Sequence, residues 1–291
     1  MGDVQVLNIK QFDQQEISQE FYSNKFRIHF EAHHKNITIP HKHDFFVSIL
    51  FTKGSGIHEI DFSSYQIQPG SVFLMKPGQT HYWELSDDAD GYIFFHTQSF
   101  YELEFIDRSL VHFPFFYLAQ NSPFLLLNKD DTERLSVYFK EINNEHHSNQ
   151  LLKRQKICTL VDLLYIELSR LYVKFENTYL LKSSVYSKQL KTLEELIEQH
   201  YVKEKSPTAY AEMMHISAKH LNRIVRQSLN KTTSDLITER VILEAKRSLV
   251  YSKDSLANVS YLLGFEDYAY FSRVFKLKTG MTPSQFASKY E

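Results

Sequence analysis

The stretch GFEDYAYFSRVFKLKTGMTPSQF, residues 264–286, sets aromatic side chains beside arginine and lysine and ends in Thr-Pro-Ser. A second stretch, SAKHLNRIVRQSLNKTTSDL, starts at Ser217 and aligns with the first at an offset of fifty residues, on Asp267. The alignment pairs Leu221 with Phe271, Arg223 with Arg273, Val225 with Phe275, Asn230 with Gly280 and Thr232 with Thr282. A repeat of this length predicts one supersecondary unit that is used twice.

Each copy of the repeat has the pattern of a helix-turn-helix. A short helix carries a small residue four positions before a turn residue: Ala211 before His215, and Ser260 before Gly264. The small side chain lets the second helix cross close to the first. The turn residue is expected to have a positive φ, which glycine adopts freely and histidine less readily.

The remaining sequence of this region predicts further helices. We expect helices over residues 188–201, 208–214, 218–229, 234–251, 256–263 and 268–279, and a short helix after residue 283. Side chains that favour the N-cap position precede several of these helices. They are Ser217, Thr233, Ser255, Asp267 and Thr282, the last followed by Pro283.

The second helix of each copy has an apolar face and a polar face. The apolar faces are expected to be buried, and they carry Leu221, Ile224 and Val225 in the first copy and Phe271, Val274 and Phe275 in the second. The polar faces carry Lys219, His220, Asn222, Arg223 and Arg226, and Tyr268, Ala269, Ser272, Arg273 and Lys276.

The polar faces suit DNA. Asparagine can pair with adenine and arginine with guanine through two hydrogen bonds, while lysine and arginine neutralise phosphates. A recognition helix places its N-terminal turns nearest the bases in the major groove. A solvated helix face is the alternative for any single residue, but recurrence at matched positions of a capped motif favours DNA contacts.

The charge of the chain is divided unevenly. Residues 1–184 hold 17 Lys and Arg against 23 Asp and Glu, whereas residues 185–291 hold 16 against 12. The overall net charge of −2 therefore hides a basic C-terminal part, where the repeat lies. Such an asymmetry indicates a nucleic-acid partner for that part, and an accident of surface composition is the alternative that charge alone leaves open.

The C-terminal motifs resemble the DNA-binding domain of the AraC/XylS transcription regulators. The resemblance lies in LLGFEDYAYFSRVFKLKTGMTPSQF and in the connecting segment LITERVILEAKRSL, where Arg240, Ala245 and Leu249 match the family pattern. It implies two helix-turn-helix units, joined by one long helix, that reach two successive major-groove segments on one face of DNA. His215 and Ser260 depart from the usual glycine and alanine.

Residues 26–97 predict an all-β barrel. Short runs rich in Phe, Ile, Val and Tyr alternate with turn signals at residues 53–56, 69–70, 77–79 and 87–91. The segments HKHDFFVSILFTKGSG and GSVFLMKPGQTHYW resemble the two cupin motifs, which implies a cupin-like sensor domain. Side chains expected to point into the barrel and bind an effector are Arg27, His29, His43, His58, Tyr82 and Trp83.

Three histidines match the metal ligands of catalytic cupins: His41, His43 and His81. The glutamate of that ligand set is missing, since its place falls at Val47 or Ser48. Three imidazoles can bind zinc, but oxygen chemistry at iron needs a carboxylate. We therefore expect no metal cofactor, and the histidines can equally end strands or line a pocket.

Two helices are expected after the barrel, over residues 130–145 and 149–175. The second has a broad leucine stripe, formed by Leu152, Leu160, Leu163, Leu164, Leu168 and Leu171. Part of this stripe can cover the barrel, and the rest is available to a second copy of the chain. If Leu164 faces that copy, Leu164→Glu should split the dimer, because an unpaired charge would be buried there.

These patterns together predict a two-domain fold: an N-terminal all-β cupin-like barrel with a C-terminal pair of helices, followed by an all-α domain of two helix-turn-helix motifs joined by a long helix. The expected boundaries are 1–128 for the sensor barrel, 129–176 for the dimerisation helices, 177–187 for a linker and 188–291 for the DNA-binding domain.

The expected function is that of a sequence-specific transcription regulator, a homodimer that binds double-stranded DNA and a small-molecule effector, and that is not an enzyme. Cys158 is the single cysteine, which rules out an intrachain disulfide. The N-terminus lacks the features of a signal peptide, and no apolar run could span a bilayer, so a cytoplasmic location is expected. Two alternatives remain open: a metal-dependent cupin enzyme with a DNA-binding tail, and a dimeric regulator without a ligand.

Overall fold

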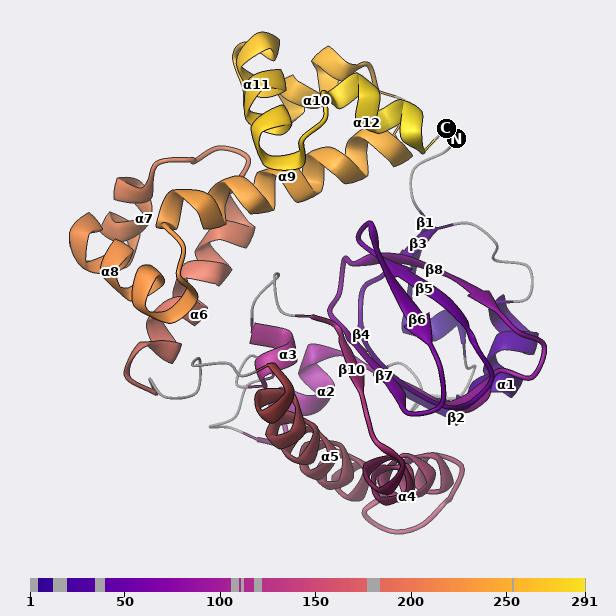
Figure 1. Cartoon of the computed structure of the whole chain (residues 1–291). Helices are drawn as coiled ribbons and strands as arrows, with labels where there is room; N and C mark the ends of the chain where they lie inside the picture. Colours follow the sequence, from indigo (N-terminus) through magenta and orange to yellow (C-terminus); the bar gives the residue numbers. More distant parts are fainter. Residues whose placement is uncertain are drawn as a thin grey trace. The chain divides into compact units, whose positions relative to one another are not determined.

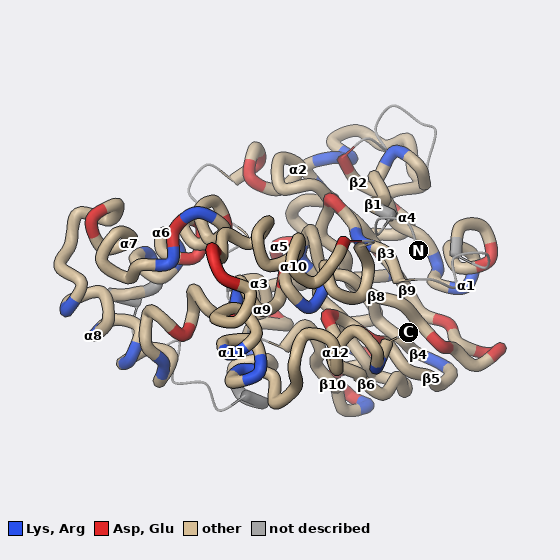
Figure 2. Tube along the Cα trace, turned by 90° about the horizontal axis from the view of Figure 1, so that it is seen from above, with Lys and Arg blue, Asp and Glu red and all other residues tan. Residues whose placement is uncertain are grey.

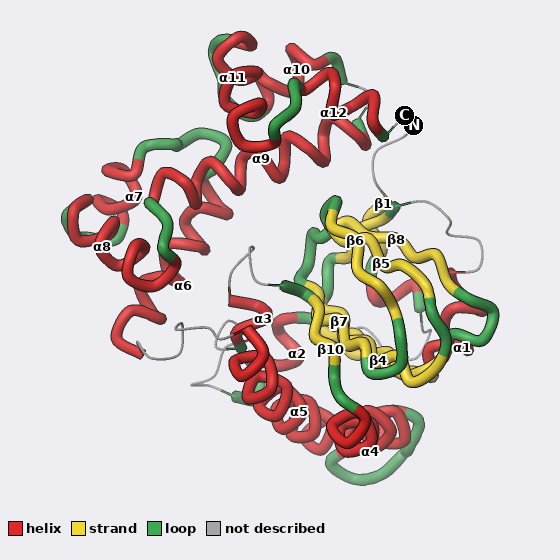
Figure 3. Tube along the Cα trace, viewed as in Figure 1, coloured by secondary structure: helices red, strands yellow, loops and turns green. Residues whose placement is uncertain are grey.

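The computed structural model describes residues 5–12, 20–34, 40–105, 110, 113–117, 122–176, 184–252 and 254–290. The chain forms two compact units, Val4–Asn177 and Thr178–Glu291, which we call the barrel unit and the helical unit. The barrel unit holds the β-strands, and the described part of the helical unit consists of helices and loops (Figures 1 and 3). The two-domain fold class predicted from the sequence is thus confirmed.

Two five-stranded sheets build the barrel unit. The first sheet has the order β1-β3-β8-β5-β6, with strands β1 (Gln5–Leu7), β3 (His41–His43), β8 (Thr80–Leu85), β5 (Gly56–Ile60) and β6 (Ser63–Ile67). The second sheet has the order β10-β7-β4-β9-β2, with strands β10 (Phe124–Leu126), β7 (Ser71–Met75), β4 (Phe46–Lys53), β9 (Asp90–His96) and β2 (Phe21–Lys25). The apolar runs between the predicted turns, FFVSILFT, GIHEIDF, YQIQPG, SVFLMK and YIFFHT, correspond to β4, β5, β6, β7 and β9.

The second sheet is buried on both faces. Along β4, Val47, Ile49 and Phe51 belong to a core between the two sheets, whereas Phe46 and Leu50 belong to a second core on the other face. Because side chains alternate along a strand, a continuous apolar run is what a strand between two cores requires. This explains the segment FFVSILF.

Helices cover the outer face of the second sheet. The second core combines residues of that sheet with residues of α4 (Lys129–His146) and α5 (Lys153–Glu176). Leu164 and Leu168 of α5 are fully buried in this core, and among the leucines of α5 only Leu163 is exposed, at 40%. Leu152 of the expected stripe precedes the helix and is 62% exposed. Leu164 therefore does not face a second copy of the chain, whereas Leu163 points elsewhere because one residue along a helix turns the side chain by about 100°.

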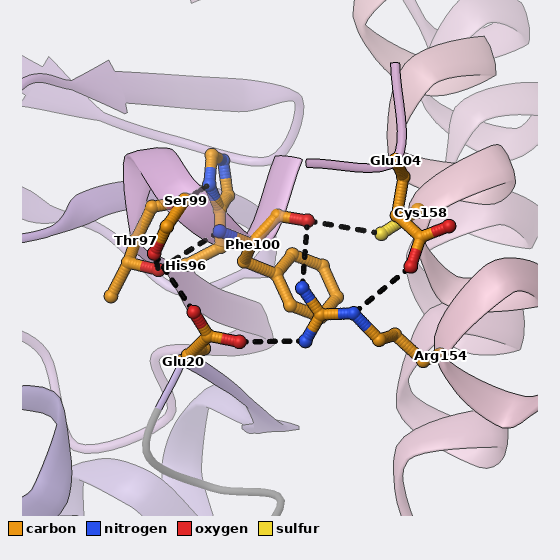
Figure 4. Close-up of polar contacts among 8 residues, drawn as sticks. All are labelled: Glu20, His96, Thr97, Ser99, Phe100, Glu104, Arg154 and Cys158. Carbon is orange, nitrogen blue, oxygen red and sulfur yellow. Dashed lines mark hydrogen bonds and ion pairs between the residues drawn. The ribbon is translucent and has the colours of Figure 1, made fainter. Parts of the chain in front are cut away.

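A charged network holds the first turn of α5 against the segment that follows β9 (Figure 4). The guanidinium of Arg154 donates to Glu20 Oε2 at 2.7 Å, to Glu104 Oε1 at 3.0 Å and to the Phe100 carbonyl at 3.3 Å. Ser99 donates to the other oxygen of Glu20 at 2.8 Å. Burial raises the pKa of the neighbouring Cys158 thiol to about 12, so this thiol is not a reactive nucleophile.

A buried polar group links the second sheet to α5. The Tyr165 hydroxyl lies 2.7 Å from His96 Nε2 and 2.9 Å from Ser48 Oγ. The other ring nitrogen of His96 lies 2.9 Å from the Thr97 carbonyl oxygen. Burial lowers the pKa of His96 to about 4. The imidazole is therefore neutral at physiological pH.

The helical unit contains helices at the positions that the sequence predicts. They are α6 (Ser184–His200), α7 (Pro207–Met213), α8 (Ala218–Leu229), α9 (Thr233–Tyr251), α10 (Leu256–Leu262), α11 (Tyr268–Thr279) and α12 (Pro283–Lys289). Helix α6 starts four residues before the expected position, so residues 184–187 are helical and not linker. The rest of the expected linker, 177–183, lies outside the described residues.

The N-caps of this unit follow the sequence closely. Ser217, Ser255, Asp267 and Thr282 each accept a hydrogen bond from a backbone N–H of the helix that they precede. For α9 the expected cap, Thr233, is wrong by one residue. Thr232 is the cap, because it forms a reciprocal capping box with Asp235. None of the described helices is both long enough and apolar enough to cross a membrane.

Candidate nucleic-acid interface and histidine cluster

The two turns of the repeat have the backbone geometry expected from the sequence. His215 has a φ of 55° and Gly264 a φ of 75°. A Cβ at Gly264 would lie 2.1 Å from the carbonyl oxygen of Val202, so this position requires glycine for space as well as for conformation. The small residues Ala211 and Ser260 are buried at the crossing of the two helices, as predicted.

The two copies differ by one residue in the turn. Ala211 and His215 lie forty-nine residues before Ser260 and Gly264, whereas the caps Ser217 and Asp267 are fifty apart. Glu266 is the additional residue. After the caps the copies agree again, since α8 and α11 both end at a left-handed residue, Asn230 or Gly280.

The recognition helices α8 and α11 bury the predicted apolar faces. Leu221, Ile224 and Val225 are buried in α8, and Phe271 and Phe275 in α11, whereas Val274 is half-buried. The side chains of the polar faces that are exposed are Lys219, Arg223, Arg226, Tyr268, Ala269, Arg273 and Lys276; those of His220, Asn222 and Ser272 are half-buried. Figure 2 shows the basic positions along α8 and α11 in blue.

Asn222 has a structural contact that the sequence did not reveal. Its side-chain oxygen accepts a hydrogen bond of 3.1 Å from the backbone N–H of Thr233, at the start of α9. Pairing with adenine needs both the oxygen and the amino group of an asparagine. In this structure Asn222 ties α8 to α9, and its role as an adenine reader stays a prediction.

Arg223 is exposed and contacts a polar residue of its own helix. One guanidinium nitrogen of Arg223 lies 2.9 Å from Nδ1 of His220, one helical turn earlier. Among the polar residues of α8, His220 thus contacts the candidate guanine reader directly.

The start of α9 also contacts α11. Lys278 of α11 donates to Asp235 Oδ1 at 2.7 Å, and Asp235 Oδ2 accepts from the hydroxyl and the backbone N–H of Thr232. Lys278, and after it Thr232, hold the pKa of the Asp235 carboxyl well below its usual range. The first turn of the connecting helix therefore contacts both recognition helices, one through Asn222 and the other through Lys278.

Two further cations hold the helical unit together. Arg240 of α9 donates to both carboxylate oxygens of Glu198 in α6, at 2.7 and 2.8 Å, and lies 4.0 Å above the Tyr201 ring. Lys205 donates to the carbonyl oxygens of Val202 at 2.9 Å and Gly264 at 3.2 Å. Lys205 thus connects the segment before the first helix-turn-helix with the turn of the second. The sequence contained no signal for this contact because its partners are backbone atoms.

In the barrel unit, strand register gathers four histidines. His41 and His43 are two residues apart in β3, so their side chains lie on the same face of the strand. Strand β3 pairs with β8 so that His41 lies opposite His81. On the other side of β8, the partner of His81 is Ile60, which places His58 on the diagonal. Neighbours in these positions lie within reach of one another.

The resulting histidine cluster is buried and closely spaced. One ligand atom from each of His41, His43 and His81 lies within 4.8 Å of the others. Nε2 of His81 is 3.4 Å from Nε2 of His43, and Nδ1 of His81 is 2.9 Å from Nε2 of His58. Burial, and after it the nearby His41, lower the pKa of His58 well below its usual value.

The predicted effector residues divide into two groups. His29, His43 and His58 are buried, and Trp83 is half-buried with its ring centroid 4.8 Å from that of His81. Arg27 instead is exposed and pairs with Glu31 at 3.0 Å. Tyr82 donates to Glu59 at 3.1 Å, on the face of β8 opposite to His81. The prediction that Arg27 and Tyr82 point into the barrel is therefore wrong.

The structure supplies no carboxylate where cupin enzymes have one. Val47 is buried in the core between the sheets, and Ser48 points to Tyr165 on the other face. The candidate metal ligands His41, His43 and His81 therefore lie together without a carboxylate. Strand register places His58 next to them.

Comparison with known proteins identifies both units. Residues 25–161 match the AraC-like ligand binding domain, and residues 210–289 match a helix-turn-helix domain of the family. The transcriptional activator RhaS of Mannheimia succiniciproducens is 24% identical over 276 residues, which cover 92% of this chain and 97% of that protein. RhaS of Enterobacter is 22% identical over 252 residues, covering 84% and 86%.

Among solved structures, ToxT from Vibrio cholerae covers 92% of this chain and 98% of its own, at 14% identity and a TM-score of 0.44. The two matched domains together span most of the sequence and agree with the resemblance found in its motifs. The chain belongs to the AraC family: it is a DNA-binding transcription regulator with an N-terminal ligand-binding domain and a C-terminal helix-turn-helix domain.

Proposed function

We propose that α8 and α11 enter two successive major-groove segments of one DNA duplex and that an effector in the barrel controls the regulator. The observation that supports the DNA contacts is the pair of matched recognition helices with exposed cations. In α8 these are Lys219, Arg223 and Arg226; in α11 they are Arg273 and Lys276. Tyr268, Ala269 and Ser272 complete the proposed surface of α11, and His220 supports Arg223.

Base reading and phosphate binding are assigned to different residues. Arg223 and Arg273 occupy matched positions in the second turn of their helices, where base edges come within reach. Arg226 and Lys276 lie farther along, where cations bind phosphate. Specificity therefore depends on the first pair, and general affinity on the second.

A gel-shift titration on a selected duplex and on a scrambled duplex tests this assignment. Arg223→Ala is expected to weaken binding to the selected duplex by about 1–3 kcal/mol more than binding to the scrambled one. Lys276→Ala, the matched control, is expected to weaken both equally. Equal losses on both duplexes for Arg223→Ala would contradict the base-reading role.

The barrel is proposed to be a sensor and not an enzyme. Its inward-facing residues His29, His43, His58 and Trp83 are proposed to line the effector site. The missing carboxylate at Val47 and Ser48 supports the absence of iron-dependent oxygen chemistry. An effector at about 100 times its dissociation constant should stabilise the fold by about 2.7 kcal/mol, which a thermal-shift screen of small molecules would detect.

The assembly and the outcome of regulation are also proposed. We place the regulator in the cytoplasm, as a homodimer whose contact includes the exposed side of α5 around Leu163. Since the relatives above are transcriptional activators by name, we propose activation. Light scattering of the full chain at micromolar concentration tests the dimer: a monomer would contradict it.

A further inference from the structure

One nitrogen pair of the histidine cluster, whose three ligand atoms lie within 4.8 Å of one another, has a spacing that fits a metal ion better than a hydrogen bond. Nε2 of His81 and Nε2 of His43 are 3.4 Å apart. Hydrogen bonds between nitrogen donors and their acceptors in proteins are shorter, at about 2.7–3.2 Å. Two imidazole nitrogens that bind the same tetrahedral zinc at about 2.0–2.1 Å are roughly 3.4 Å apart.

His41 completes a set of three. Its ring centroid lies 4.4 Å from that of His81 and 5.0 Å from that of His43. All three side chains are buried and come from two paired strands. Strands hold ligands more rigidly than loops do, which is what a preformed site requires.

His58 supplies the outer contact that metal-binding histidines usually have. When Nε2 of His81 binds a metal, its Nδ1 carries the proton and can donate it to a neighbour. Nε2 of His58 lies 2.9 Å from that Nδ1. The contact fixes the tautomer and the ring orientation of His81, so His58 is a positioning residue.

We propose that His41, His43 and His81 bind one Zn²⁺ ion, with His58 orienting His81 and the fourth position open to the effector. The effector part rests on the sensor function proposed above. The site has three neutral ligands, and the described buried side chains between the two sheets include no carboxylate. The charge of the ion is therefore uncompensated by protein, which favours an effector with an anionic donor.

The histidine cluster thereby revises the expectation, drawn from the missing glutamate, that the barrel works without a metal. A carboxylate is needed for iron oxygenases, but three histidines and one exchangeable ligand form a complete zinc site.

Zinc binding is tested on the full-length protein, stripped with a chelator and titrated with ZnCl₂ against a chromophoric competitor. The expected result is one tight site per chain. His43→Gln and His41→Gln, tested separately, should each abolish it. His58→Gln should weaken it by about 10–100-fold.

His96→Gln is the matched control. His96 is equally buried in the same unit, but its Nε2 lies 2.7 Å from the hydroxyl of Tyr165, which belongs to the second core. Its zinc affinity should equal that of the unchanged protein. No saturable binding in the unchanged protein, or the same affinity in all variants, would overturn the zinc site.

The open position is tested with Co²⁺ in place of zinc and sodium azide as the anionic probe. Azide should shift the visible spectrum of the four-coordinate cobalt protein. A bound cobalt whose spectrum azide leaves unchanged would overturn the open position. Gel shifts on the same preparations separate this inference from the proposed function, because a protein that binds DNA specifically without binding zinc refutes the site alone.

Discussion

The two units of this regulator place their functional side chains in opposite ways. In the helical unit, the candidate DNA contacts are mostly exposed and project from helices whose ends are set by local caps such as Ser217 and Asp267. In the barrel unit, the histidine cluster is buried and is assembled from three strands by register. The positions of exposed side chains on a capped helix follow from residues nearby in sequence. The positions of buried side chains in a barrel depend on the pairing of strands that are far apart in sequence.

The same contrast appears within neighbouring positions. Leu163 and Leu164 are adjacent in sequence, yet one is exposed and the other fully buried. Asn222 and Arg223 are adjacent too, yet the first binds the backbone of α9 and the second faces outward. Substitutions at two adjacent positions can therefore separate an effect on function from an effect on the free energy of unfolding.

The largest effect is expected from Leu164→Glu. A carboxylate placed in the core between α5 and the second sheet should lower the free energy of unfolding by more than about 4 kcal/mol. Leu163→Glu, the adjacent control, should change it by about 0.5 kcal/mol or less and should dissociate the proposed dimer. Urea unfolding and light scattering measure the two effects. Equal destabilisation by both variants would contradict the packing of α5 described above.

The buried His96 should make the barrel unit sensitive to acid. Its pKa is about 4 in the folded protein, below the ordinary value of 6.5, so the unfolded chain binds more protons between these values. The stabilisation is complete above pH 6.5 and decreases as the pH falls, by about 2 kcal/mol between pH 7 and pH 5. Urea titrations at both pH values should show this loss, and His96→Gln should lose about 2 kcal/mol less over the same interval. The same pH dependence in both proteins would refute the assignment.

Asp235→Ala tests the first turn of α9, which contacts both recognition helices. The substitution removes one half of the capping box of α9 and the contact with Lys278, and should cost about 1–2 kcal/mol of stability. Ser234→Ala, at the exposed neighbouring position, should cost about 0.5 kcal/mol or less. Thermal unfolding of the full chain compares them. A cost for Ser234→Ala as large as that for Asp235→Ala would show that helix propensity, and not the junction, is measured.

The smallest effect on stability is expected from Asn222→Ala, which is compared with Arg223→Ala at the adjacent position. Asn222→Ala leaves the N–H of Thr233 without its side-chain acceptor, which should lower stability by about 1 kcal/mol. Arg223→Ala should leave stability nearly unchanged and act on DNA affinity. Unfolding and gel-shift measurements on the same two variants decide between the roles, and a loss of specific DNA affinity without loss of stability in Asn222→Ala would support Asn222 as a base reader.

The sequence by itself determined the helical unit almost completely. The repeat, the small residues Ala211 and Ser260, and the turn residues with positive φ, His215 and Gly264, all have the predicted structure. Their signals are local, because a cap or a turn involves residues only a few positions apart. The same locality allowed the apolar strands of the barrel to be recognised.

Only the tertiary structure decided which polar residues meet. Side chains on β3, β5 and β8 are brought together by strand pairing, so neither the place of His58 beside His81 nor the outward direction of Tyr82 could be read from motifs. The contact of Asn222 with Thr233 and that of Lys205 with Gly264 involve backbone atoms, which carry no sequence signal. Register and main-chain contacts are properties of the folded chain, and they determine here which histidines lie together and which asparagine contacts the backbone of α9.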